Sequence, residues 1–94
     1  MEFKDRDIES FWGDPDANPP NRVPSELRRM VYRKLQMLDA ANDLRDLRVP
    51  PHNHLEKLER DRAGQHSIRV NDRWQLCFVW TQEGAKEVEF CDYH

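Results

Sequence analysis

Ninety-four residues are enough for one domain with a modest core, because a chain of this length buries only about two thirds of its unfolded surface. Three Trp, four Phe and two Tyr supply the bulk of a core, which argues against disorder even though 35% of the residues are charged. The net charge of −3 argues against a uniformly basic surface for nucleic acid. No apolar run approaches the roughly 18 residues of a membrane span.

The charges are unevenly distributed along the chain. Residues 1–21 carry two basic and six acidic residues, whereas residues 22–48 carry seven basic and four acidic ones. A partner is bound by a local patch and not by the total charge, so the basic middle of the chain leaves an anionic partner open. Two Cys without a spacing motif, and no signal peptide, indicate a reducing compartment, and we expect a cytoplasmic protein.

Two helices are predicted in the first half of the chain. Residues 5–12 place Ile8, Phe11 and Trp12 on one face of a short helix, and the breaker-rich residues 13–22 form a loop. A second helix is expected over residues 26–41, with Ser25 as its N-cap. Its apolar residues recur at helical spacing and face a core: Leu27, Met30, Val31, Leu35 and Leu38.

From His54 onward the apolar residues alternate with polar ones, which predicts strands. Residues 54–58 are expected to form a short strand, followed by a meander with a core face and a more polar, half-exposed face. The even positions supply the core face: Ile68, Val70, Trp74, Leu76, Phe78, Trp80, Val88 and Phe90. The fold class is therefore α+β, with a single domain over residues 1–94 in which helices pack on a small antiparallel sheet.

The same alternation predicts how the strands pair, because a slip of one residue would exchange the two faces. A three-residue turn at 71–73 pairs Arg69 with Gln75. A turn centred on Gly84 pairs Gln75 with Tyr93 and Cys77 with Cys91. We therefore expect a row of polar side chains on the solvent face beside the last residues of the chain.

Groups with acid, base and anion-binding chemistry gather on this predicted sheet. Asp92, Tyr93 and His94 end the chain, and a carboxylate beside His can orient it and raise its pKa. Arg offers a bidentate fork for phosphate, so a row of Arg beside these residues suits phosphodiester chemistry. The candidate RNA or phosphate contacts are Arg62, Arg69, Arg73, Gln75 and His54. The alternative is a solubilising strand face with a frayed terminal His.

Metal and cysteine chemistry are weaker interpretations of the same residues. His52 and His54 are not followed by a second ligand pair at zinc-site spacing. Cys77 and Cys91 would place two thiols on one face, with His66 on the other. A nucleophilic Cys would need an adjacent base, and the sequence suggests none.

Several segments, in order, resemble the HigB toxins of bacterial type II toxin–antitoxin modules, within the RelE/ParE superfamily. They are Leu38-Asp-Ala-Ala, Asp46-Leu-Arg-Val-Pro-Pro, Arg62-Ala-Gly-Gln-His-Ser-Ile-Arg-Val-Asn-Asp-Arg-Trp, Leu76-Cys-Phe and Asp92-Tyr-His. The resemblance implies a RelE-like fold with two or three N-terminal helices. It implies a ribosome-dependent mRNA endonuclease that needs no metal or other cofactor. It also implies a HigA-type helix-turn-helix antitoxin that neutralises the toxin. The toxin would contact operator DNA only through this antitoxin. It gives catalytic roles to His94, Asp92 and Tyr93.

Two departures from the resembled pattern reduce positive charge near the expected phosphate. Many relatives have Arg where this chain has Gln75, and some have His and Lys in the segment aligned with Glu56 and Glu59. The alternative function is therefore a toxin-fold module with little catalysis, acting mainly through antitoxin binding and operon autoregulation. A gyrase poison of the ParE type is a third interpretation, against which the terminal Asp-Tyr-His argues.

Overall fold

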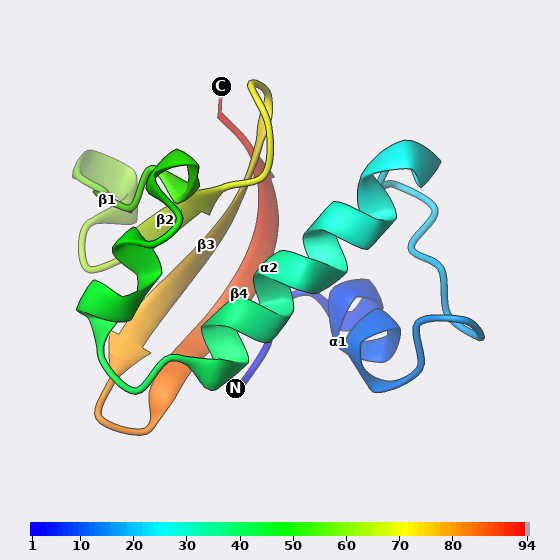
Figure 1. The fold of residues 1–94 in the computed structure, drawn as a ribbon, viewed down its shortest axis with the longest axis horizontal. Coiled ribbons are helices and arrows are strands. Elements are labelled where there is room, and N and C mark those ends of the chain that lie inside the picture. The colour runs from blue at the N-terminus through cyan, green and yellow to red at the C-terminus, as the bar shows by residue number, and fades with distance from the viewer. Residues whose placement is uncertain (94) are drawn as a thin grey trace.

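The computed structural model describes residues 1–93, in which helices cover one face of an antiparallel sheet (Figure 1). Within these residues the structure has two α-helices, α1 (Arg6–Gly13) and α2 (Arg28–Ala40). Four short 3-10 helices connect the elements: η1 (Ser25–Leu27), η2 (Leu44–Arg48), η3 (Pro51–Asn53) and η4 (Arg60–Arg62). Both predicted helices are confirmed to within a residue or two, and residues 14–24 between them contain no helix or strand, as the breakers predicted.

The predicted cap of the second helix is wrong. Ser25 lies inside η1, and its hydroxyl donates to Glu26 rather than capping a backbone N–H. The α-helical residues begin three positions later, at Arg28, with Leu27 at the cap position and no side-chain cap. Pro24 precedes this turn at the cap position of η1, with an extended ψ of 136°.

The sheet has the order β1-β2-β3-β4, with every neighbouring pair antiparallel. Its strands are β1 (Glu56–Lys57), β2 (His66–Arg69), β3 (Trp74–Thr81) and β4 (Gly84–Asp92). The predicted pairing across the first long turn is confirmed, with Arg69 opposite Gln75 and Ile68 opposite Leu76. The turn at 71–73 therefore has the three-residue length that the alternation required.

The predicted pairing of β3 with β4 is wrong by two residues. Gln75 lies opposite Cys91, not Tyr93, and Cys77 lies opposite Glu89, not Cys91. The hairpin turn is two residues long, because Thr81 pairs with Gly84. A bulge makes this possible: the register shifts between Cys77 and Val79, and Glu87 takes a left-handed φ of 51°.

The bulge also explains why the apolar residues still meet. Between the bulge and the turn, even-numbered residues of β3 lie opposite odd-numbered residues of β4. Ala85 therefore lies opposite Trp80 and is buried in the core. A two-residue turn without a bulge would have turned one strand's apolar side chains outward. One extra residue in β4 therefore reconciles a tight hairpin with a continuous core.

The core lies between α2 and the face of the sheet that carries the even-numbered residues of β2 and β3. Val31, Leu35 and Leu38 of α2 are buried against it, and Trp74 stacks on Phe90 with ring centroids 4.7 Å apart. The first residues run along the free edge of β4, where Phe3 forms a parallel bridge with Val88. No helix within residues 1–93 is long and apolar enough to cross a membrane.

Candidate active site

A pocket of about 330 Å³ opens at the end of the sheet where the β2–β3 turn and the end of β4 meet. It is lined by His54, Glu56, Arg69, Asp72 and Tyr93. Three of these residues, His54, Arg69 and Tyr93, were predicted as site residues from the sequence. They come from three separate parts of the chain, and the fold brings them together at one pocket.

His54 is held at the pocket by a buried anchor. It follows η3 with a left-handed φ of 48°, and the preceding Asn53 is completely buried. The Asn53 amide donates to the carbonyl oxygens of Leu47 and Val49 at 3.2 and 3.3 Å. Its side-chain oxygen accepts a hydrogen bond from the buried Lys34 of α2. This contact connects the loop before His54 to α2. Burial of the Lys34 amine removes it from water and lowers its pKa.

Arg69 ends β2 and points into the pocket. Its guanidinium donates to Asp72 at 2.7 Å and to the carbonyl oxygen of Asn71 at 3.2 Å. Asn71 shapes the turn, because its side-chain oxygen accepts from the backbone N–H groups of Arg73 and Trp74. The turn therefore presents Arg69 and its carboxylate partner at the mouth of the pocket.

Backbone pairing with the sheet continues past β4 to Tyr93, the last described residue. The backbone N–H of Tyr93 donates to the carbonyl oxygen of Arg73 at 2.8 Å, one position beyond the end of β4. Arg73 also donates to Asp92 at 3.1 Å and lies over the Trp74 ring, 4.8 Å from its centroid. Asp92 and Tyr93 are thus held in place, and His94 lies outside the described residues.

The Tyr93 hydroxyl is partly enclosed by its neighbours. Burial raises the pKa of Tyr93, and Arg69 opposes the rise while Glu56 and Cys77 add to it. The phenol therefore stays protonated at neutral pH, and it can donate a hydrogen bond to an incoming anion.

The middle of the polar sheet face is buried, which corrects the prediction of a solvent-exposed row. Cys77 and Cys91 are both buried free thiols, and the Cys91 thiol donates to Glu89 at 3.0 Å. Cys77 and burial raise the pKa of Cys91, so its thiol remains protonated. Gln75 is only 6% exposed, and its side-chain oxygen has no hydrogen-bond partner within residues 1–93.

Arg62 covers this buried middle and does not line the pocket. Its guanidinium donates to Glu89 at 2.8 Å and to Gln65 at 3.1 Å. Burial alone would raise the pKa of Glu89, but hydrogen bonds from Arg62, Cys91 and Lys4 lower this pKa to about 2. The ion pair therefore closes the face over the two thiols. His66 lies on the opposite face, as predicted, where it stacks on Phe78.

Sequence reasoning missed Glu56 and Asp72 as pocket residues. Glu56 was noted only as an acidic departure, although it pairs with Ser67 and its carboxylate lies 2.6 Å from His54 Nε2. The alternation would have placed it on the polar face had the short strand been aligned with β2. Asp72 could not be assigned to the pocket from the sequence, since its position depends on how Asn71 shapes the turn.

Each basic side chain predicted as a phosphate contact faces a carboxylate. The pairs are His54–Glu56, Arg62–Glu89, Arg69–Asp72 and Arg73–Asp92. The last two are open to solvent, and such pairs contribute only about 0–1 kcal/mol. A phosphate can therefore displace the carboxylates from Arg69 and Arg73 at small cost, whereas the Arg62–Glu89 pair is largely buried at its acidic end.

Among the described residues, no group of three or more His, Cys, Asp or Glu side chains is arranged to hold a metal ion. The groups that meet in the pocket are one arginine in an exposed ion pair, an imidazole beside a carboxylate and a protonated phenol. Such a set can bind an anionic oxygen, donate to it and move a proton nearby.

Known proteins resemble the chain over its full length. A family model described as a RelE-like toxin of the type II toxin–antitoxin system HigB matches residues 1–94. Toxin HigB-1 of Vibrio cholerae serotype O1 is 39% identical over 94 residues, which cover 100% of this chain and 96% of the relative. An uncharacterized protein of Haemophilus influenzae is 40% identical over 78 residues, covering 83% of this chain and 75% of that protein. The chain therefore belongs to the HigB-like family of RelE-like toxins of type II toxin–antitoxin systems.

Proposed function

We propose that this toxin is a metal-independent endoribonuclease that cleaves mRNA on the ribosome in the cytoplasm and so blocks translation. The observation that supports this proposal most directly is the pocket in which His54, Arg69 and Tyr93 meet at the end of the sheet. A HigA-type helix-turn-helix antitoxin would neutralise the toxin and connect it to operator DNA.

The reaction that fits this pocket is an internal transfer at phosphorus. The ribose 2′-OH loses its proton and attacks the adjacent phosphate, the bond to the 5′-oxygen breaks, and that oxygen takes up a proton. The products are a 2′,3′-cyclic phosphate and a free 5′-OH, so no water or metal enters the balance. The protein must orient the nucleotide, neutralise the equatorial oxygens and move two protons.

The described residues provide these functions as follows. Arg69 and Arg73 bind the phosphate after their carboxylate partners are displaced. The protonated Tyr93 hydroxyl donates to a phosphate oxygen or orients the base. His54, fixed by Glu56 at 2.6 Å, lies where it can exchange a proton with the substrate. Gln75 retains hydrogen-bonding capacity without charge, and Arg62 supports the site by holding Glu89.

His94 is proposed as the second proton-exchanging group, with Asp92 as its partner. Tyr93, the last described residue, is bonded into the sheet through the carbonyl oxygen of Arg73. Loss of a general acid or base lowers a rate by about 10²–10⁴-fold. His94→Gln should therefore lower cleavage by that factor, and deletion of His94 should nearly abolish it.

The test is primer extension on a message translated in a purified system, with a melting curve for each variant. His52→Gln is the matched control, because His52 is an exposed residue two positions before His54 and outside the pocket. Full cleavage by the His94 deletion, with an unchanged melting temperature, would refute a catalytic role for the end of the chain.

The second candidate function is a toxin-fold module with little catalysis, which acts through antitoxin binding and operon autoregulation. The ion pairs of Arg62, Arg69 and Arg73 and the uncharged, buried Gln75 favour it. This candidate predicts no cleaved message from wild-type protein at any concentration, while the antitoxin complex still represses its operon.

A further inference from the structure

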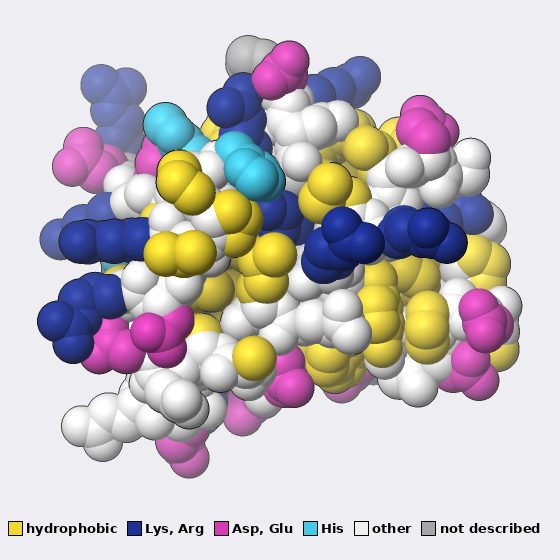
Figure 2. All heavy atoms as spheres, in the orientation of Figure 1, with side chains coloured by type: hydrophobic (Ala, Val, Ile, Leu, Met, Phe, Trp, Pro, Cys, Tyr) yellow, Lys and Arg dark blue, Asp and Glu magenta, His cyan; other side chains and the backbone are white. Residues whose placement is uncertain are grey.

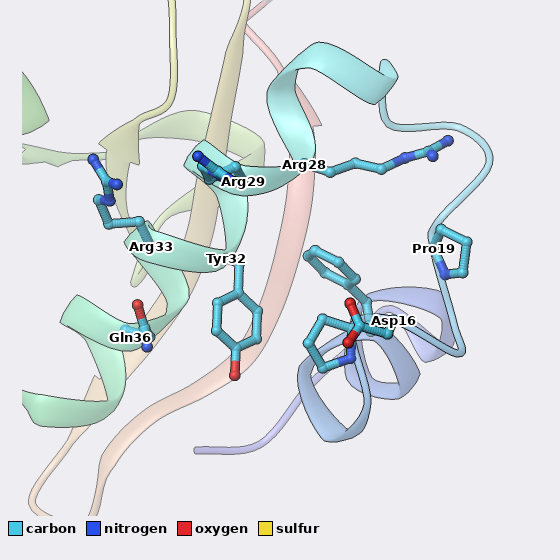
Figure 3. Close-up of a pocket in the computed structure, with 9 residues that line it drawn as sticks. Asp16, Pro19, Arg28, Arg29, Tyr32, Arg33 and Gln36 are labelled. Carbon is cyan, nitrogen blue, oxygen red and sulfur yellow. The ribbon is translucent and has the colours of Figure 1, made fainter.

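Outside the candidate active site, a groove lies between α1 and α2. Its volume is about 430 Å³, and α1, the loop that follows it and the outer side of α2 form its walls. Figure 3 shows Tyr32 projecting from α2 toward α1, with Arg28, Arg29 and Arg33 along the same helix. The groove lies on the helical layer, whereas the candidate active site lies on the sheet face turned away from α2.

Arg29 and Arg33 are exposed, and neither has a carboxylate partner within residues 1–93. Five other arginines of the chain are ion-paired: Arg22, Arg45, Arg62, Arg69 and Arg73. Arg28 donates only to the carbonyl oxygen of Val23, at 3.1 Å. In a chain of net charge −3 with many carboxylates available, these cations remain without a counter-charge.

The position of these arginines also opposes helix stability. Arg28 and Arg29 occupy the first turn of α2, which has no acidic residue and where the helix dipole disfavours positive charge. Arg29 and Arg33 are four residues apart, so they repel one another across one turn. Each effect costs only a few tenths of a kcal/mol to about 1 kcal/mol, and an anionic partner would reverse the sign of both.

The floor of the groove is apolar and its aromatic rings are already engaged. Phe11 meets Tyr32 edge to face at 5.7 Å, and Trp12 packs on Tyr32 at 5.2 Å. Pro15 and Pro19 complete the apolar lining. Rings packed in this way offer edges and aliphatic surface rather than a free stacking platform, so the groove suits an aliphatic side chain better than a nucleobase.

Asp16 adds a second argument against nucleic acid. Its carboxylate lines the groove with the arginines, where it would repel a phosphate backbone. It would accept hydrogen bonds from the backbone N–H groups of a peptide. Figure 2 shows basic side chains in a line along α2, above a band of hydrophobic side chains on the α1 side, which is the pattern of an apolar slot with a cationic rim.

We propose that this groove is the docking site for a segment of the cognate antitoxin in which acidic side chains flank an aliphatic one. The acidic groups pair with Arg29 and Arg33, and the aliphatic side chain enters the slot beside Tyr32. Membership of a toxin–antitoxin family implies such a partner, and the proposal does not depend on the nuclease activity. Docking on the helical layer leaves the pocket on the sheet face uncovered by this contact.

The experiment is isothermal titration of the toxin with its purified cognate antitoxin. The double variant Arg29→Glu/Arg33→Glu should bind roughly 100-fold more weakly at low salt, and Arg29→Lys/Arg33→Lys should bind close to wild type. Arg48→Glu/Arg60→Glu makes the same change in net charge at exposed residues outside the groove, and it should leave the affinity unchanged. Added salt should reduce the difference between wild type and the groove variant.

A charge-exchange experiment identifies the antitoxin segment that docks in the groove. Reversing the antitoxin's acidic residues to Lys should weaken binding to the wild-type toxin and restore it to the Arg29→Glu/Arg33→Glu variant. Unchanged antitoxin affinity in the groove variant would overturn the proposal. So would a loss of ribosome binding or of self-association by that variant with antitoxin binding intact, since the occupant would then be RNA or a second copy.

The same titration separates this proposal from the proposed nuclease. Arg69→Ala alters the candidate active site and not the groove, so it should keep full antitoxin affinity while losing cleavage. A wild-type toxin without nuclease activity would refute the proposed function and leave the groove measurement unaffected.

Discussion

Replacing Glu89 by Gln should destabilise the fold at neutral pH more than replacing an exposed acid of the β3–β4 hairpin. Glu89 is 12% exposed, and it accepts from Arg62 at 2.8 Å, from Cys91 at 3.0 Å and from Lys4 at 3.2 Å. A neutral amide keeps the shape of the side chain but loses the charge that these donors surround. Arg62 would then cover the buried thiols without its counter-charge.

The magnitude follows from the lowered pKa of Glu89. A fall from its ordinary 4.5 to about 2 corresponds to about 3 kcal/mol of folding free energy. Because the folded-state pKa is depressed, this contribution is complete above pH 4.5 and is lost as the pH falls toward 2. A domain of this size is stabilised by about 5–14 kcal/mol in total, so the loss should be large.

Urea unfolding followed by tryptophan fluorescence measures the effect between pH 7 and pH 2. The difference between wild type and Glu89→Gln should be about 3 kcal/mol at pH 7 and should shrink toward zero near pH 2, where the wild-type carboxyl becomes protonated. Glu83→Gln is the control, since Glu83 meets Lys86 in an exposed ion pair and its loss should change little. A difference at pH 7 below about 1 kcal/mol, or one that does not vary with pH, would refute the reasoning.

Three further outcomes concern the candidate active site, and primer extension on a translated message measures each of them. Arg69→Ala should lower cleavage while the melting temperature is kept, because the exposed Arg69–Asp72 pair adds little stability; normal cleavage would remove Arg69 from the phosphate site. Gln75→Arg should raise cleavage if the missing charge limits the rate, and no gain would mean that Arg69 or Arg73 already supplies it. Extending the chain beyond His94 should reduce cleavage, because added residues would share the space of the nucleotide; full activity of an extended chain would count against a terminal site.

The local features of this protein were determined by its sequence. Apolar spacing predicted both helices, and strict alternation predicted the pairing of Arg69 with Gln75, because side chains in a strand must alternate between the two faces. Order and type of the motifs predicted the family, and three of the proposed site residues, His54, Arg69 and Tyr93, do line one pocket.

Tertiary structure decided what depends on contacts between distant segments. A two-residue turn and a one-residue bulge at Glu87 together moved the pairing of β4 by two residues from the predicted one, and the bulge keeps Ala85 and Val88 buried in one core. No spacing rule encodes that choice, since the energy lies in packing against α2. The partners of Arg62, Arg69 and Arg73 were likewise hidden, because each carboxylate reaches its arginine through a turn or across the sheet. Sequence therefore determined which chemical groups the protein has, and folding determined which of them face one another.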